Sequence, residues 1–153
     1  MKRFLASGFG VGLVWQNIFG NKKGGGTLAP LIFTVLVYFL NLNVFVLSIL
    51  FVSLLLIYFY SVEDHYADED PSWITLDEIV GMSLVSLASP LEMLPLIAGF
   101  LVFRASDILK QPKFVSQLED YPGKLGVLYD DLGAGLLGLL SATIVHQVSL
   151  LTL

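Results

Sequence analysis

Long stretches without charge dominate the chain. Residues 28–60 carry no charged side chain, and Asn41 and Asn43 are their main polar interruption. Because a straight membrane crossing needs only about 20 residues, this stretch predicts a hairpin of two helices, over 28–41 and 43–60, with the asparagines in its turn. Strands are disfavoured here because an open sheet edge leaves backbone groups without hydrogen bonds in lipid.

Two further apolar stretches predict three more helices. The first, 79–103, is broken at Ser89-Pro90. Since a proline disfavours helical geometry in the residue before it, a second pair of helices is predicted over 76–88 and 91–105. The last stretch, 127–153, predicts one long helix.

The composition agrees with this pattern. Of the 153 residues, 56% are apolar and 14% are charged, and the mean hydropathy is +0.80. Soluble domains average about 45–50% apolar and about 25% charged residues, so lipid is the expected solvent for part of the surface. At this length one compact unit is expected, and residues 1–153 are interpreted as a single domain. The alternative is a soluble enzyme with an unusually apolar core.

Net charge and cysteine content exclude several classes of protein. The net charge of −5 and the pI near 4.7 have the wrong sign for a nucleic-acid-binding surface. The sequence has no cysteine, which excludes a disulfide scaffold, a thiolate zinc site and a cysteine-based phosphatase.

The charges gather in three segments. Residues 1–27, 61–78 and 104–131 hold 20 of the 21 charged side chains. If each predicted hairpin goes out and back, these segments share one face of the membrane, with Glu92 on the other. All eight Lys and Arg lie on the shared face, which the positive-inside rule places in the cytoplasm. The C-terminus then ends on the far side, where His146 is expected to have a structural role.

The first candidate cluster is the acidic pair Asp77 and Glu78 at the start of a predicted helix. Carboxylates are stabilised by the helix dipole there, and Thr75 could cap the helix, so capping and solubility are one explanation. Against it, Gly81 and Leu84 follow Asp77 by four and seven residues, which turns that face towards protein. A carboxylate packed against protein needs a partner.

The second cluster steps by three residues along a helix. Arg104, Asp107 and Lys110 share one face, and two cations with a carboxylate suit a phosphate beside a metal ion. An ordinary salt-bridged helix end explains the same spacing equally well.

The third cluster is the pair Asp130 and Asp131, which enters the last apolar helix. A stripe of small residues follows Asp131, and small residues let another backbone approach closely. The stripe consists of Ala134, Gly135, Gly138 and Ala142. Asp131 is therefore expected in a tight helix interface, where an ionised carboxylate costs a few kcal/mol unless it is compensated.

A glycine-rich segment precedes the first hairpin. Lys22 and Lys23 are followed by Gly24, Gly25, Gly26 and Thr27. Glycine-rich backbone at the start of a helix can bind phosphate, although a flexible linker is the more common role. Together, the acidic clusters would repel one another unless hard cations neutralised them, and Mg²⁺ takes oxygen ligands of this kind.

Three of these segments resemble motifs of the phosphatidylglycerophosphatase A family. Residues 70–81 match Asp-Pro/His-x-x-Ile-x-x-Asp-Glu-x-x-Gly, and residues 103–110 match Phe-Arg-x-x-Asp-x-x-Lys. Residues 123–135 match Gly-x-x-Gly-Ile/Val-x-x-Asp-Asp-x-x-Ala-Gly. More weakly, Gly26-Thr27 resembles the family's Pro-Gly-Thr.

The resemblance implies Mg²⁺-dependent hydrolysis of phosphatidylglycerol phosphate to phosphatidylglycerol and inorganic phosphate. It also implies an all-α core of about six helices with one of them central. We therefore expect a compact integral-membrane helical bundle with a polar cytoplasmic face, in the bacterial cytoplasmic (inner) membrane. The expected partner is an anionic phospholipid substrate, and no protein partner is implied.

The resemblance also assigns roles to residues. The expected Mg²⁺ ligands are Asp70, Asp77, Glu78, Asp107, Asp130 and Asp131. The expected phosphate contacts are Gly26, Thr27, Arg104 and Lys110. The expected catalytic residues are Asp77, Lys110, Asp130 and Asp131, with a metal-activated water favoured over an aspartate as nucleophile. The alternative class is a non-catalytic membrane protein, such as a divalent-cation carrier or a scaffold.

Overall fold

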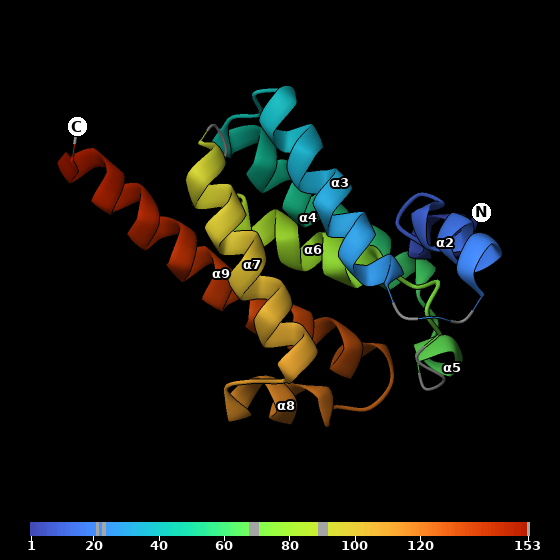
Figure 1. Cartoon of the computed structure of the whole chain (residues 1–153). Coiled ribbons are helices and arrows are strands. Elements are labelled where there is room, and N and C mark those ends of the chain that lie inside the picture. The colour runs from blue at the N-terminus through green and yellow to red at the C-terminus, as the bar shows by residue number, and fades with distance from the viewer. Residues whose placement is uncertain (21, 23, 68–70, 89–91, 153) are drawn as a thin grey trace.

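The computed structural model describes residues 1–20, 22, 24–67, 71–88 and 92–152, and these residues form helices and no strand (Figure 1). The helices are α1 (Lys2–Ala6), α2 (Val11–Phe19), α3 (Gly25–Phe39), α4 (Val44–Ser61), α5 (Asp64–Ala67), α6 (Leu76–Val85), α7 (Met93–Leu109), α8 (Lys113–Glu119) and α9 (Lys124–Thr152). The all-α prediction is confirmed for this part of the chain.

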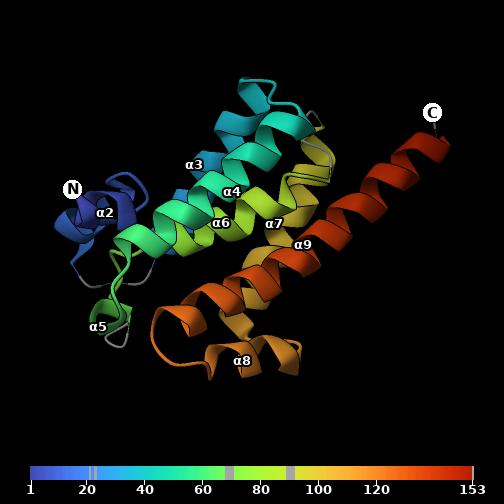
Figure 2. The same cartoon turned by 180° about the vertical axis from the view of Figure 1, so that it is seen from behind.

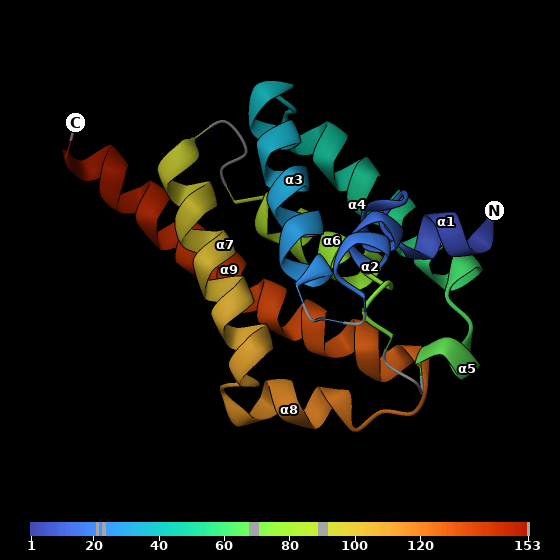
Figure 3. The same cartoon turned by 45° about the vertical axis from the view of Figure 1, so that its right-hand side comes forward.

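Helix α6 lies at the centre of the fold. It packs against α3, α4, α7 and α9 (Figure 3), and Leu76, Val80, Met82 and Val85 on it are fully buried. At a rise of 1.5 Å per residue its ten residues span about 15 Å, half of the roughly 30 Å hydrocarbon core of a bilayer. Because four helices pack around α6 and several of its side chains are fully buried, α6 is enclosed by the other helices. The central helix implied by the resemblance is confirmed.

The apolar hairpin predicted over 28–60 is α3 and α4. Asn43 caps α4, because its side chain accepts a hydrogen bond from the Val46 amide at 3.0 Å. Asn41 has a positive φ of 49°, a conformation that asparagine tolerates better than most residues. The two asparagines thus form the predicted turn.

The small-residue stripe of α9 lies at its crossing with α7. A Cβ added to Gly138 would lie 2.7 Å from the carbonyl oxygen of Gly99, and one added to Gly99 would lie 3.0 Å from Ala142 Cβ. Both glycines allow the backbones to approach this closely. The predicted break at Ser89-Pro90 lies outside the described residues, between α6 and α7.

Residues 1–20 are more structured than the sequence suggests. α1 and α2 meet at a corner in which Gly8, Phe9 and Gly10 all have positive φ. These glycines interrupt the apolar periodicity, which is why no helix is predicted here. The short helix α8 is also missed, because its seven residues are too few to show a period.

Two helices, α4 and α9, are long and apolar enough to cross a membrane by length and composition. Only 22% of each candidate span is buried inside the structure, and large apolar side chains such as Phe45, Leu56, Leu140 and Ile144 are exposed on them. Both helices lie open on one side (Figure 2). These exposed surfaces account for the excess of apolar residues in the composition.

Candidate active site

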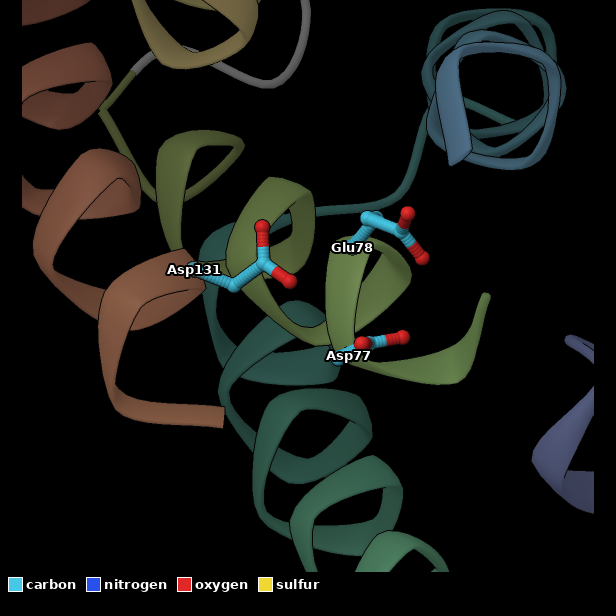
Figure 4. A group of neighbouring side chains, drawn as sticks. All are labelled: Asp77, Glu78 and Asp131. Atoms are coloured by element: carbon cyan, nitrogen blue, oxygen red, sulfur yellow. The ribbon is translucent and has the colours of Figure 1, made fainter. Parts of the chain in front are cut away.

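Three carboxylates from two helices converge on one point. Asp77 and Glu78 stand on the first turn of α6, and Asp131 stands on α9 and faces that turn (Figure 4). One oxygen from each lies within 4.8 Å of the others. Asp77 Oδ1, Glu78 Oε2 and Asp131 Oδ1 are each buried without a hydrogen-bond partner. We call these three residues the acidic triad.

Two glycines bring the triad together. Gly81 lies one turn after Asp77, and Gly135 lies one turn after Asp131. A Cβ on Gly135 would lie 2.8 Å from the Gly81 carbonyl oxygen, and one on Gly81 would lie 2.9 Å from the Asp131 carbonyl oxygen. α6 and α9 can therefore cross in backbone contact beside the carboxylates.

A basic group adjoins the triad from α7. Arg104 donates to Asp107 Oδ2 at 2.6 Å through Nη1 and to Thr27 Oγ1 at 3.2 Å through Nη2. Its Nε is buried without a partner. Thr27 is in the first turn of α3, next to Gly26, where a Cβ would lie against the Glu78 carboxylate and displace it. The two predicted phosphate-binding segments therefore meet beside the triad.

Lys110 connects three acidic side chains. Its Nζ lies 3.2 Å from Asp107 Oδ1 and 3.8 Å from Glu119 Oε2, and it also pairs with Asp130. Asp130 in turn accepts a hydrogen bond from the Asp131 amide at 2.9 Å. Although burial opposes the charged form, these carboxylates raise the pKa of Lys110, so it stays an ammonium at neutral pH.

The structure divides the six predicted metal ligands into two groups. Asp77, Glu78 and Asp131 form the triad, whereas Asp107 and Asp130 lie in ion pairs with Arg104 and Lys110. Asp70 lies outside the described residues. Metal ligation by Asp107, Asp130 and Asp70 stays a prediction.

The alternative in which Thr75 caps α6 is contradicted by the structure. Thr75 occupies the N-cap position, but its side chain makes no capping hydrogen bond. Its hydroxyl is buried without a partner and faces the backbone of Gly8. The packing of the α1–α2 corner against residue 75 accounts for this orientation.

Tyr58 was missed by the sequence analysis. Its ring is fully buried and its hydroxyl donates to the Lys124 carbonyl at 2.8 Å. This bond ties the last part of α4 to the first turn of α9, the helix that carries Asp131. No signal in the uncharged stretch distinguishes Tyr58 from its apolar neighbours, because every face of α4 is apolar.

The triad is electrostatically unfavourable by itself. Burial raises the pKa of the Asp77 carboxyl to about 6. Burial, together with the charge of Asp77 beside it, raises the pKa of Glu78 well above its ordinary value. Clustered carboxylates with unpartnered oxygens are the donor set that a hard divalent cation such as Mg²⁺ uses in proteins. The residues present therefore fit such an ion.

These shifts predict how the stability of the metal-free protein depends on pH. A carboxyl whose folded-state pKa is raised binds more protons folded than unfolded, so stability falls as pH rises through the window from about 4 to above 6. For Asp77 the loss is a few kcal/mol. We expect the melting temperature in detergent with EDTA to drop by several degrees between pH 5 and pH 8.

The control for this pH effect is Asp77→Asn, which should flatten the dependence. Added Mg²⁺ should reduce the fall, because a cation binds the deprotonated carboxylates of the folded state. A melting temperature that rises from pH 5 to pH 8 without metal would contradict the electrostatics described above.

Comparison with known proteins finds a matching family and a curated relative. The family model "Phosphatidylglycerophosphatase A" matches residues 4–146. A curated protein of Bacteroides thetaiotaomicron named "Putative phosphatidylinositol-3-phosphatase" is 30% identical over 142 residues, covering 86% of this chain and 84% of that protein. No solved structure matches the chain significantly.

The match spans the whole candidate site. Residues 4–146 include Gly26 and Thr27, the three triad residues and the basic group on α7. The resemblance found in the motifs is thereby confirmed, and both comparisons support a lipid phosphatase. This chain belongs to the phosphatidylglycerophosphatase A family.

Proposed function

We propose that this protein hydrolyses the terminal phosphomonoester of phosphatidylglycerol phosphate with the help of Mg²⁺. The observation that carries the proposal is the acidic triad beside the Arg104–Thr27 contact, since carboxylates that each keep one buried oxygen without a partner, next to a guanidinium, suit a metal and a phosphate together. In the reaction a P–O bond to water forms and the P–O bond to the glycerol oxygen breaks. The products are phosphatidylglycerol and inorganic phosphate.

The triad residues would hold the cation. Asp77, Glu78 and Asp131 each present an oxygen that has no other partner among the described residues. When bound, Mg²⁺ supplies Lewis-acid polarisation of the phosphate. Lys110 pairs with Asp130, next to Asp131, and also faces Glu119 at the end of α8.

Arg104 and Thr27 would orient the phosphate. The guanidinium is fixed by Asp107, so its planar set of donors is oriented before substrate arrives. Lys110 keeps its positive charge because its pKa is raised, so it would stabilise negative charge on phosphate or leaving oxygen without acting as a base. A side chain at Gly26 would displace the Glu78 carboxylate from its place in the triad.

We also propose that the protein is embedded in the bacterial inner membrane with this site facing the cytoplasm. The site lies at the end of the fold where α3 begins and α7 ends. At the other end of α7, Glu92 pairs with His146 Nδ1 at 2.8 Å. The positive-inside rule then supports the cytoplasm for the end that carries the basic residues.

The test is phosphate release by the purified full chain in lipid–detergent micelles. We expect phosphatidylglycerol phosphate to be hydrolysed faster than phosphatidylinositol 3-phosphate and glycerol 3-phosphate, and EDTA to abolish release until Mg²⁺ is restored. Activity that survives EDTA would refute the metal proposal. Preference for phosphatidylinositol 3-phosphate would replace the proposed substrate, and Mg²⁺ binding without any phosphate release would favour a cation carrier or scaffold.

A further inference from the structure

The N-terminal unit, α1 and α2 with the corner between them, has an apolar outer face. Phe4, Phe9, Val14 and Ile18 are each at least 45% exposed. The rings of Phe4 and Phe9 meet edge to face with centroids 6.5 Å apart, and Val14 and Ile18 share one side of α2 because they are four residues apart. Exposed apolar groups gathered in this way mark an interaction surface.

The inner face of the same unit is already occupied. Gly12 lies against the Trp73 carbonyl with no room for a Cβ, and Val11 and Leu13 pack against the core. The Thr75 amide donates to the Ala6 carbonyl at 3.2 Å. The orientation of α2 is therefore fixed, and its outer face stays exposed in the folded protein.

The position of the N-terminal unit suggests what covers that face. α1 packs on α4 and α2 packs on α3 (Figure 3). Lys2 Nζ lies 5.6 Å from the centroid of Tyr60, near the end of α4, and Trp15 packs on Gly24, just before α3. If the α3–α4 hairpin enters the bilayer with its 40–43 turn leading, the unit lies at the membrane surface.

The charge distribution of the first part of the chain indicates which kind of partner binds this face. The first 62 residues contain Lys2, Arg3, Lys22 and Lys23 and no acidic residue, although the whole chain has 13 acidic and 8 basic residues. Lys2 pairs with Glu63 at 2.8 Å, just after this stretch, while Arg3 and Lys22 are exposed. An apolar face flanked by basic residues is typical of a helix that lies in the interface of an anionic membrane.

We propose that the N-terminal unit is an interfacial anchor that binds the anionic headgroup region of the leaflet. It lies in the membrane plane, with Phe4, Phe9, Val14 and Ile18 among the upper acyl chains and Arg3 and Lys22 at the phosphates. This anchor does not depend on phosphatase activity. It adds a contact between the protein and the membrane surface, separate from the binding of substrate at the acidic triad.

The experiment uses single cysteines, since the natural chain has none. Full-length Ile18→Cys and its neighbour Asn17→Cys, both at exposed positions, carry an environment-sensitive fluorophore and are reconstituted into vesicles. Neutral phosphatidylcholine vesicles are compared with vesicles containing phosphatidylglycerol. The readout is quenching by a lipid-attached quencher relative to a water-soluble one.

In anionic vesicles we expect this quenching ratio to be severalfold higher at residue 18 than at residue 17. Neutral vesicles, high salt or Lys22→Gln should lower the ratio at residue 18, because each basic residue near an anionic surface contributes about a fivefold preference that salt screens. Equal ratios at the two positions would overturn the proposal. So would immersion that is independent of lipid charge and salt, or cross-linking between two copies through residue 18.

Discussion

Replacing Asp131 by asparagine is expected to abolish phosphate release and to make the metal-free protein more stable. Asp131 is 3% exposed and its Oδ1 has no hydrogen-bond partner. Asparagine has the same shape but cannot ionise, so it removes one carboxyl from a cluster whose charged forms repel one another. The stability gain comes from relief of that repulsion. A substitution in an active site often raises stability and lowers activity in this way.

The expected loss of activity is about a thousandfold. Changing a residue that merely supports a metal ligand costs about 10–100-fold, and the loss of a direct ligand should exceed that. Mg²⁺ should also stop raising the melting temperature of the variant, because a site lacking one carboxylate binds the cation more weakly. The measurements are phosphate release and thermal unfolding in detergent, each with Mg²⁺ and with EDTA.

A matched control is Asp120→Asn, which removes the same charge from an exposed turn. It should leave activity and the effect of Mg²⁺ unchanged. If Asp131→Asn kept a tenth of the activity, or lost stability without metal, the triad would not be the metal site.

The sequence predicts the helices and the acidic core for physical reasons that are local. The long uncharged stretches require helices in lipid, and α3, α4, α7 and α9 begin and end within a few residues of the predicted bounds. The spacing of Asp131 and Gly135 predicts a carboxylate at a close helix crossing, which α6 provides.

Local spacing does not predict which carboxylates join the acidic triad and which form ion pairs with Arg104 and Lys110. Asp130 and Asp131 are neighbours, yet one pairs with Lys110 and the other faces α6. Adjacent residues on a helix point about 100° apart, so the outcome depends on which helix covers which side. Local spacing likewise cannot reveal that Gly81 and Gly135 are the residues that meet.

Gly135→Val is expected to separate α6 from α9 and to destabilise the fold by about 3 kcal/mol. A Cβ at this position would lie 2.8 Å from the Gly81 carbonyl oxygen and 3.3 Å from its Cα. Because these atoms are backbone, no side-chain rotation relieves the overlap. Moving α9 outward also carries Asp131 away from Asp77 and Glu78, so the effect of Mg²⁺ on thermal unfolding should disappear.

The matched control is Leu136→Val, at the adjacent residue, which is 49% exposed. It places the same β-branched side chain in the same helix, so any difference between the two variants reports the crossing rather than helix propensity. For this control we expect the free energy of unfolding to change by no more than about 0.5 kcal/mol, and phosphate release to stay unchanged. A Gly135→Val protein with the same unfolding temperature as Leu136→Val would show that α6 and α9 do not need backbone contact, and the convergence of the three carboxylates would then require another cause.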